Sequence, residues 1–554
     1  MEYQSLNKTL EHSFRLHWNR DALSNYQGDT LQYSEVARKI RLLHICFEQC
    51  GLKRGDKVAL CARNQYNWGV CFLATLTYGA VAVPILHEFK PDNIHYLVNH
   101  SDARVLFVDD VVWDGLSEVE MPGLSVIVQM NTLQYLYASE RSLYEVREHL
   151  QENFDKLYPE GFGPDGMNYY EDGPEELALI NYTSGTSGYS KGVMIPYRAL
   201  MCNVDFALKT AEPQMTCDSE MVAMLPAAHM YGLMFEFLFE MTIGAHVHYL
   251  TRVPSPKIIL EAFRNIRPDV IIAVPLIIEK VYKSQLKPVI EKNRFYLSIP
   301  FLSGAVKKRI RDGLIEAFGN RFEEVILGGA GVNPEVEQFL HEIHFPFTVG
   351  YGMTECAPLI TYAKWYKGKI GSCGKPITGC KVRIDSSDPE HVPGEIQISG
   401  DNVFLGYYKN SKATEAAFTS DGWFRTGDMG VIDSEGYIFI KGRCKCMILT
   451  ANGQNIYPEE IEAVINNVSY IVDSLVIEDG TGLTALVFPD YHQGVLDGMD
   501  ASNLESKIQG LLPEINKLLP GYSQIRKIEF MPEDFERTPK KSIKRYLYQR
   551  NDKV

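Results

Sequence analysis

The sequence predicts an α/β fold, with a large N-terminal domain of stacked α/β subdomains followed by a small α+β C-terminal domain. Short apolar runs alternate with amphipathic segments of helical period, and three of the runs end in glycine or proline, in LALINYTSG, DVIIAVP and EEVILGG. Beyond about residue 445 the segments become shorter. Ligands of such folds bind where strands end, so these three positions mark a candidate site.

The first elements follow from the same periodicity. Apolar residues recur at helical spacing between Ser34, the predicted N-cap, and Gly51, the predicted stop. A short apolar strand is expected from Val58, and GAVAVPI predicts another from Gly79. Strands and helices therefore alternate from the N-terminus onward.

The C-terminal segments predict a separate unit. Strands are expected over 471–477 and 483–488, and one helix is expected to carry the apolar residues from Leu504 to Ile515. We therefore predict two domains, at 1–444 and 445–554.

Composition excludes several classes of protein. With 55 Lys and Arg against 70 Asp and Glu, the formal charge is −15, which repels a nucleic-acid backbone. No apolar run approaches the roughly 20 residues of a membrane-spanning helix, the N-terminus lacks a secretory pattern, and the 11 cysteines do not resemble a disulfide framework. We expect a cytoplasmic protein with no nucleic-acid partner.

The segment TSGTSGYSKG directly follows the predicted strand LALINY. Its glycines let the backbone fold closely around a ligand, its hydroxyl groups can donate hydrogen bonds, and Lys191 adds a positive charge. These properties favour phosphate binding, although the residue order of a Walker A loop is missing, and a flexible surface loop stays open as the alternative. The candidate residues are Thr183, Ser184, Gly185, Thr186, Ser187, Gly188 and Lys191.

Six motifs in fixed order resemble those of one enzyme family. They are TSGTSGYSKGV, GGAGV from Gly328, GYGMTE from Gly350, GWFRTGD from Gly422, the pair Gly442–Arg443, and NGQNIYPEEIE from Asn452. With RGDKVAL and GAVAVPI they cover nearly the whole chain. The sequence is identified as a member of the adenylate-forming (ANL) superfamily, and it is most similar to AMP-dependent acyl-CoA synthetases of the long-chain fatty-acid branch.

The resemblance implies two half-reactions. ATP adenylates a carboxylic acid with release of pyrophosphate, and coenzyme A then displaces AMP to form a thioester. A carboxylate is a poor electrophile, so AMP turns one of its oxygens into a leaving group, and cations must offset the charge around the α-phosphate. The implied ligands are ATP, Mg²⁺, coenzyme A and a small-molecule carboxylate.

Roles for single residues follow from the matching motifs. Glu355 is implied as the Mg²⁺ ligand, an oxygen donor that suits a hard cation, and Thr354 as a donor to the α-phosphate. Asp428 would accept from both ribose hydroxyls, Arg443 would donate to ribose or phosphate, and Tyr351 would pack on adenine. Surface, turn and core positions are the alternatives. The surrounding backbone is implied to come from Gly329, Ala330, Gly331, Gly350, Gly352 and Met353.

The acyl side is implied by LPAAHMYG and the residues after it. His229 occupies the position at the mouth of the acyl site, with a purely structural histidine as the alternative. No aspartate stands near it to pair with a substrate amine, which disfavours a free amino acid. The segment MYGLMFEFLFEM is expected either to line an apolar acyl tunnel or to form a buried helix.

The resemblance also implies a mobile C-terminal domain. Lys445 matches the family's hinge, and Gly453 lies in the loop that would line the pantetheine tunnel. The family's C-terminal catalytic lysine is replaced by Ser542 in TPKKSIKRYLY. We expect Lys541 or Lys544 to bridge the carboxylate and the α-phosphate instead, with a solvated basic tail as the alternative.

We therefore predict an AMP-forming long-chain fatty-acid–CoA ligase. The alternative within the enzyme class is an acyl-adenylate ligase that loads an acyl carrier protein. From a different class, Ser542 permits a nucleotide-binding pseudoenzyme. A long-chain substrate is compatible with peripheral membrane contact, and the sequence does not indicate an oligomeric state.

Overall fold

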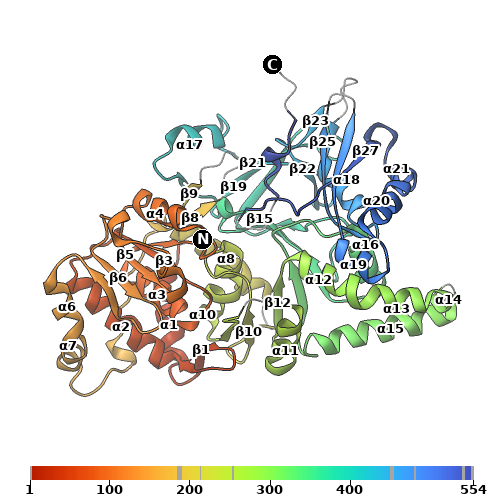
Figure 1. Cartoon of the computed structure of the whole chain (residues 1–554). Coiled ribbons are helices and arrows are strands. Elements are labelled where there is room, and N and C mark those ends of the chain that lie inside the picture. The colour runs from red at the N-terminus through yellow and green to blue at the C-terminus, as the bar shows by residue number, and fades with distance from the viewer. Residues whose placement is uncertain are drawn as a thin grey trace.

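The computed structural model describes residues 3–183, 190–211, 214–252, 255–297, 299–449, 455–479, 482–538 and 543–550. It has the predicted α/β class, with strands and helices alternating through a large N-terminal part and a smaller C-terminal part beyond it (Figure 1). The predicted boundary at 444/445 falls between strands β22 and β23.

An eight-stranded sheet organises the N-terminal part, in the order β20-β9-β8-β4-β3-β5-β6-β7. Its central pairs are parallel, whereas β9 runs antiparallel to β8 and β7 to β6. The strands are β3 (Lys57–Cys61), β4 (Val81–Pro84), β5 (Ala103–Val108), β6 (Val126–Gln129), β7 (Tyr135–Ala138), β8 (Leu177–Thr183), β9 (Lys191–Pro196) and β20 (Gly406–Tyr407). The helices around it are α1 (Leu6–Leu16), α2 (Tyr33–Gln49), α3 (Tyr66–Tyr78), α4 (Pro91–His100), α5 (Asp110–Trp113), α6 (Arg141–Glu148), α7 (Leu150–Leu157) and α8 (Tyr197–Ala211).

Helix α2 is the first predicted helix, but its N-cap is not Ser34. The cap is Gln32, whose backbone N–H donates to the Glu35 carboxylate at 2.8 Å, so Ser34 already lies in the first turn. The helix ends at Gln49, and Gly51 adopts a positive φ of 67°, which confirms the predicted stop.

Two further sheets lie beside one another. Strands β10, β11, β1 and β2 form one, and the parallel strands β12, β13 and β14 form the other. The backbone N–H of Asp269 donates to the Glu220 carbonyl at 3.1 Å and joins them. The strands are β1 (Asp21–Asn25), β2 (Thr30–Gln32), β10 (Glu220–Ala223), β11 (His246–Tyr249), β12 (Val270–Ala273), β13 (Glu324–Leu327) and β14 (Phe347–Val349). The nearby helices are α11 (Pro256–Ile266), α12 (Pro275–Val281), α13 (Lys287–Lys292), α14 (Arg294–Leu297), α15 (Pro300–Ala317) and α16 (Pro334–Glu342).

Two antiparallel sheets lead to the C-terminal part, in the orders β15-β16-β17 and β18-β19-β21-β22. Their strands are β15 (Tyr351–Gly352), β16 (Leu359–Tyr362), β17 (Lys375–Pro376), β18 (Cys380–Asp385), β19 (Gly394–Gly400), β21 (Phe424–Ile432) and β22 (Ile438–Arg443), with helix α17 (Ser411–Ala417) after β20.

The C-terminal part has its own apolar core, formed by residues between Ile456 and Ile528. Its strands are β23 (Ile448–Leu449), β24 (Asn455–Ile456), β25 (Ile471–Glu478), β26 (Leu483–Pro489) and β27 (Ile525–Phe530), and its helices are α18 (Pro458–Ile465), α19 (Tyr491–Leu496), α20 (Ala501–Gly510) and α21 (Leu512–Leu518). The two predicted strands are β25 and β26. The single predicted helix is wrong, because Pro513 cannot continue the hydrogen bonding of α20 and instead lies in the first turn of α21.

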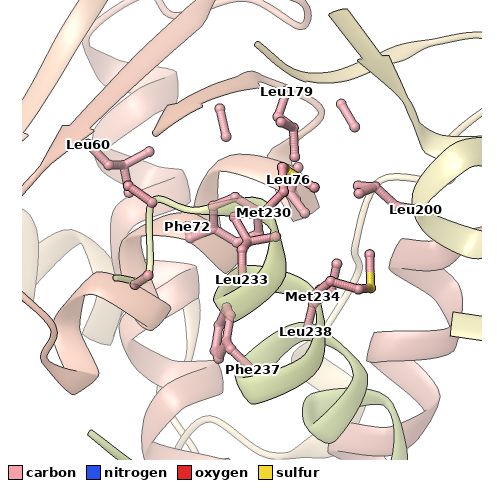
Figure 2. Packing of buried hydrophobic residues seen from close by; sticks show 14 of the residues in the cluster. Leu60, Phe72, Leu76, Leu179, Leu200, Met230, Leu233, Met234, Phe237 and Leu238 are labelled. Atoms are coloured by element: carbon pink, nitrogen blue, oxygen red, sulfur yellow. The ribbon is translucent and has the colours of Figure 1, made fainter. Parts of the chain in front are cut away.

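The segment MYGLMFEFLFEM forms a continuous buried helix, made of α9 (Met230–Leu233), a π turn over Met234–Leu238, and α10 (Phe239–Ile243). Figure 2 shows Met230, Leu233 and Phe237 packed toward Phe72 of α3. Across the described residues, no helix combines the length and apolarity needed to cross a membrane.

Two glutamates lie within this apolar helix. The Glu236 carboxylate accepts from the Leu225 N–H at 2.9 Å, whereas neither carboxyl oxygen of Glu240 has a hydrogen-bond partner from another described residue. Burial raises the pKa of Glu236 well above its usual range and that of Glu240 to about 8. Glu240 is therefore neutral at pH 7.

We expect Glu240→Gln to flatten the dependence of stability on pH. Between pH 4.5 and 8 folded Glu240 holds a proton that the unfolded chain releases, so rising pH favours unfolding of the wild type. We would measure both melting temperatures from pH 5 to 8.5. The melting temperature of the variant relative to that of the wild type should increase as the pH rises to about 8. The exposed Glu120→Gln is the control, and parallel curves for wild type and Glu240→Gln would contradict the prediction.

Candidate functional site

A cavity of about 1640 Å³ lies where several strands end. Thr183 ends β8, Val274 follows β12, and the stretches 328–330 and 350–355 follow β13 and β14, and all of them line the cavity. Strands β12, β13 and β14 are parallel neighbours in one sheet, so their carboxyl ends share one edge, and the end of β8 from the eight-stranded sheet lines the same cavity.

Two of the predicted glycines occupy backbone positions beside the cavity that disfavour a side chain. Gly329 has a φ of 83°, and a Cβ at Gly352 would stand 2.3 Å from the Pro358 carbonyl oxygen. Ala330, Gly350 and Met353 line the cavity as well. Gly331, which was predicted to line the nucleotide, is not part of the cavity wall.

Lys191 and Glu355 are connected across the cavity through Tyr407. Lys191 lies opposite Thr183 in the β8–β9 pair, and its ammonium stands 4.6 Å from the centre of the Tyr407 ring. The Tyr407 hydroxyl donates to the Glu355 carboxylate at 3.1 Å, and burial raises the pKa of that tyrosine. The predicted loop residues Ser184, Gly185, Thr186, Ser187 and Gly188 lie outside the described residues.

Tyr351, Asp428 and Arg443 form one cluster. The Tyr351 hydroxyl donates to Asp428 Oδ2 at 2.7 Å, and Arg443 Nε stands 3.0 Å from Asp428 Oδ1. Tyr351 and Arg443 line the cavity, whereas the buried Asp428 lies behind them and is not part of its wall. Burial raises the pKa of Asp428, and the nearby guanidinium opposes this rise.

His229 combines a structural position with a position in the cavity wall. It is the N-cap of α9, where its Nδ1 accepts from the Tyr231 N–H at 3.3 Å. The preceding turn is held by the Asn181 side chain, which donates to the Ala228 carbonyl at 2.9 Å. His229 therefore caps a helix and also lines the cavity, and its place at the mouth of an acyl site stays a prediction.

The C-terminal cations have acidic partners. Lys544 lines the cavity, but its ammonium stands 2.5 Å from a Glu536 carboxylate oxygen, which raises the pKa of the lysine. Arg545 pairs with the buried Glu462. Lys445 also lines the cavity. Lys541 and Gly453 lie outside the described residues.

The C-terminal part contacts the N-terminal part through polar groups. The Lys283 ammonium donates to the Asn466 carbonyl at 2.9 Å, and the Asn333 side chain donates to that of Asn467.

Tyr407 and Arg537 are among the cavity residues that were not predicted from the sequence. Tyr407 follows no motif, although its strand β20 pairs with β9 directly after the predicted loop. Arg537 also lines the cavity, and its guanidinium pairs with Asp473 at 2.7 Å. Only the folded chain brings these side chains to the site.

Models of known protein families match both parts of the chain. A model of the AMP-binding enzyme family matches residues 10–408, and a model of the AMP-binding enzyme C-terminal domain matches residues 446–551. A long-chain-fatty-acid–CoA ligase of Mycobacterium bovis is 26% identical over 92% of this chain and 89% of its own length.

Solved structures share the fold. ATP-bound MatB from Rhodopseudomonas palustris superposes with a TM-score of 0.76 at 22% identity, covering 98% of each chain. The anthranilate CoA ligase AuaEII in complex with anthranoyl-AMP also reaches 0.76 at 18% identity, over 99% of this chain and 96% of its own. AuaEII is named for anthranilate, whereas the mycobacterial relative is named for a long-chain fatty acid.

We expect Asp428→Asn to weaken ATP binding by about tenfold to a hundredfold, since a hydrogen bond to a charged group contributes ~1.5–3 kcal/mol. The dissociation constant of ATP, measured by calorimetry, tests this. Asp421→Asn is the matched control, because Asp421 also pairs with an arginine, Arg383 at 2.6 Å, but lies away from the cavity wall. Equal ATP affinities in both variants would contradict a ribose-binding role for Asp428.

Proposed function

Because this chain belongs to the family of AMP-binding enzymes, we propose that it is an AMP-forming acid–CoA ligase whose acid is a long-chain fatty acid. The observation that carries this proposal is a single cavity in which the nucleotide motifs adjoin an extended apolar wall. The named relatives of similar length support the same substrate class.

The lining of the cavity supports a long acyl chain. The whole cavity, about 1640 Å³ with the nucleotide motifs included, exceeds the roughly 300–1,000 Å³ typical of a site for one small ligand, so it has room for an acid beside the nucleotide. Apolar side chains line it from four elements: α8, β10, the helix after His229, and β12. They include Phe206, Ala207, Met221, Met224, Phe235, Phe239 and Ile272. When the alkyl chain of a fatty acid leaves water and packs against such a wall, the gain in free energy is proportional to the apolar area buried.

Glu240 also lines the apolar section. An ionised carboxylate there would oppose an alkyl chain, but the pKa of about 8 keeps this group neutral at pH 7. The wall therefore presents no charge to the tail of the substrate.

At the nucleotide end, the donor set suits Mg²⁺ and phosphate. Glu355 offers carboxylate oxygens at the cavity wall, which a hard cation prefers. Mg²⁺, when bound, would supply positive charge to the phosphate oxygens. Lys191 would add a second charge, and Thr354, buried at the start of the turn Thr354–Cys356, would orient the α-phosphate.

The remaining residues would act in sequence. His229 would stand at the entrance of the acyl section while the carboxylate attacks the α-phosphate and pyrophosphate leaves. Rotation of the C-terminal part at Lys445 would then break contacts such as Lys283 with Asn466 and admit the thiol arm of coenzyme A.

The proposal is tested by pyrophosphate release from Mg-ATP with a panel of straight-chain carboxylates, with and without coenzyme A. We expect long-chain acids to give multiple turnovers that require coenzyme A. Turnover with an acyl carrier protein but not with coenzyme A would identify the carrier-loading alternative. ATP binding without pyrophosphate release across the panel would overturn the proposal and favour a nucleotide-binding pseudoenzyme.

We further expect Lys541→Ala or Lys544→Ala to lower the rate of adenylation by roughly 10²–10³-fold, the loss typical of one charge-stabilising donor. Thiolysis of preformed acyl-adenylate should be unaffected in the same variant. Lys527→Ala is the matched control, because Lys527 also forms an exposed pair, with Glu529 at 2.6 Å. Wild-type adenylation rates in both variants would show that neither lysine replaces Ser542.

A further inference from the structure

A histidine pair and a glutamate lie together on the sheet β10-β11-β1-β2. His246 and His248 alternate along β11 with the fully buried Val247 and Tyr249, so both imidazoles project from the same face. Glu220 begins β10 and lies opposite His246 in the parallel pair. None of these three residues lines the large cavity, although Met221, the next residue of β10, does.

The three side chains converge on one point. Glu220 Oε2 stands 2.6 Å from His248 Nε2 and 3.2 Å from His246 Nδ1. The carboxylate oxygen and one nitrogen of each imidazole lie within 4.8 Å of one another. Ligand atoms of a tetrahedral zinc site, at about 2.0–2.1 Å from the ion, are roughly 3.3 Å apart, so small side-chain rotations suffice to surround an ion.

A hydrogen bond on the far side of the ring orients His246. Its Nε2 lies 2.7 Å from the hydroxyl of Ser24 on β1, which in turn lies 2.6 Å from the Thr30 hydroxyl on β2. When Nε2–H donates to Ser24, Nδ1 has a lone pair for an ion beside Glu220, whereas without an ion a proton on Nδ1 can donate to the carboxylate. Metal-binding histidines commonly donate their other ring N–H in this way.

We propose that Glu220, His246 and His248 form a binding site for a divalent transition-metal ion of the zinc type, distinct from the nucleotide site. Two imidazoles and one carboxylate suit Zn²⁺, Co²⁺ or Ni²⁺, whereas Mg²⁺ prefers oxygen ligands alone. The side chains of the two histidines are 14% and 16% exposed and that of Glu220 is 30% exposed, so a water molecule can complete the coordination.

The ion would join the edge strand β10 to its neighbour β11. Both strands continue toward the large cavity, β10 to Met224 and Leu225 and β11 to Leu250 and Thr251, which are residues of its wall. Occupancy would thus stabilise the two strands on which the acyl section rests, without contact between the ion and the acyl chain.

The test is titration of the full-length protein with Zn²⁺ and, separately, with Co²⁺, both in excess Mg²⁺ to occupy the carboxylate site for hard cations. We expect one ion to bind per chain and to raise the melting temperature, because it binds the folded state. His246→Gln and His248→Gln should each weaken binding at least tenfold. His391→Gln is the matched control, since that histidine is exposed and pairs with Asp388 at 3.1 Å. Unchanged affinity in both of the first two variants would overturn the proposal.

Two measurements keep the test decisive if a histidine variant folds poorly. Ser24→Ala retains all three ligands and should weaken Zn²⁺ binding by about tenfold, because it removes the orienting hydrogen bond. The absorption spectrum of the Co²⁺-loaded wild type should lack the near-ultraviolet band of cobalt–thiolate coordination. A strong thiolate band would assign the ion to the cysteines and overturn the site.

Discussion

The buried carboxylate of Asp428 constrains the nucleotide half of the molecule. A carboxylate removed from water is costly unless donors satisfy it, and here the donors come from two other strands, Tyr351 on β15 and Arg443 at the end of β22. The cluster therefore ties the strand after β14 to the last strand before the C-terminal part. Because Arg443 stands only two residues before the proposed hinge Lys445, the proposed movement of the C-terminal part would change what covers Asp428.

Most of the fold was predictable because its signals are local. Apolar runs that end in glycine or proline identified β8, β12 and β13, and the helical period identified α2. The wrong predictions concern single positions at which a neighbouring residue decides where a helix begins or ends. Gln32 caps α2 in place of Ser34 because Glu35 is placed to accept from its backbone, and Pro513 divides the predicted C-terminal helix.

The candidate site was predictable only where its residues share a motif. Residues 328–330 and 350–355 reach the cavity because each stretch directly follows a strand. Pairs formed across long sequence separations were not predictable. The contact of Tyr407 with Glu355 spans 52 residues, and the ion pair between Arg537 and Asp473 spans 64. A pattern in the sequence supplies a charge, but only the fold decides which partner neutralises it.

Strand β11 shows how strongly such partners control a carboxyl group. On its buried side, near Tyr249, Glu240 lacks donors from other described residues and its pKa rises to about 8. On the opposite side burial also acts to raise the pKa of Glu220, but hydrogen bonds from His246 and His248 outweigh it and bring the pKa to about 2. At pH 7 one glutamate is thus a neutral part of an apolar wall and the other an anion. The two pKa values shift in opposite directions because side chains alternate along β11. The alternation places two histidines on the face beside Glu220 and none on the face near Glu240.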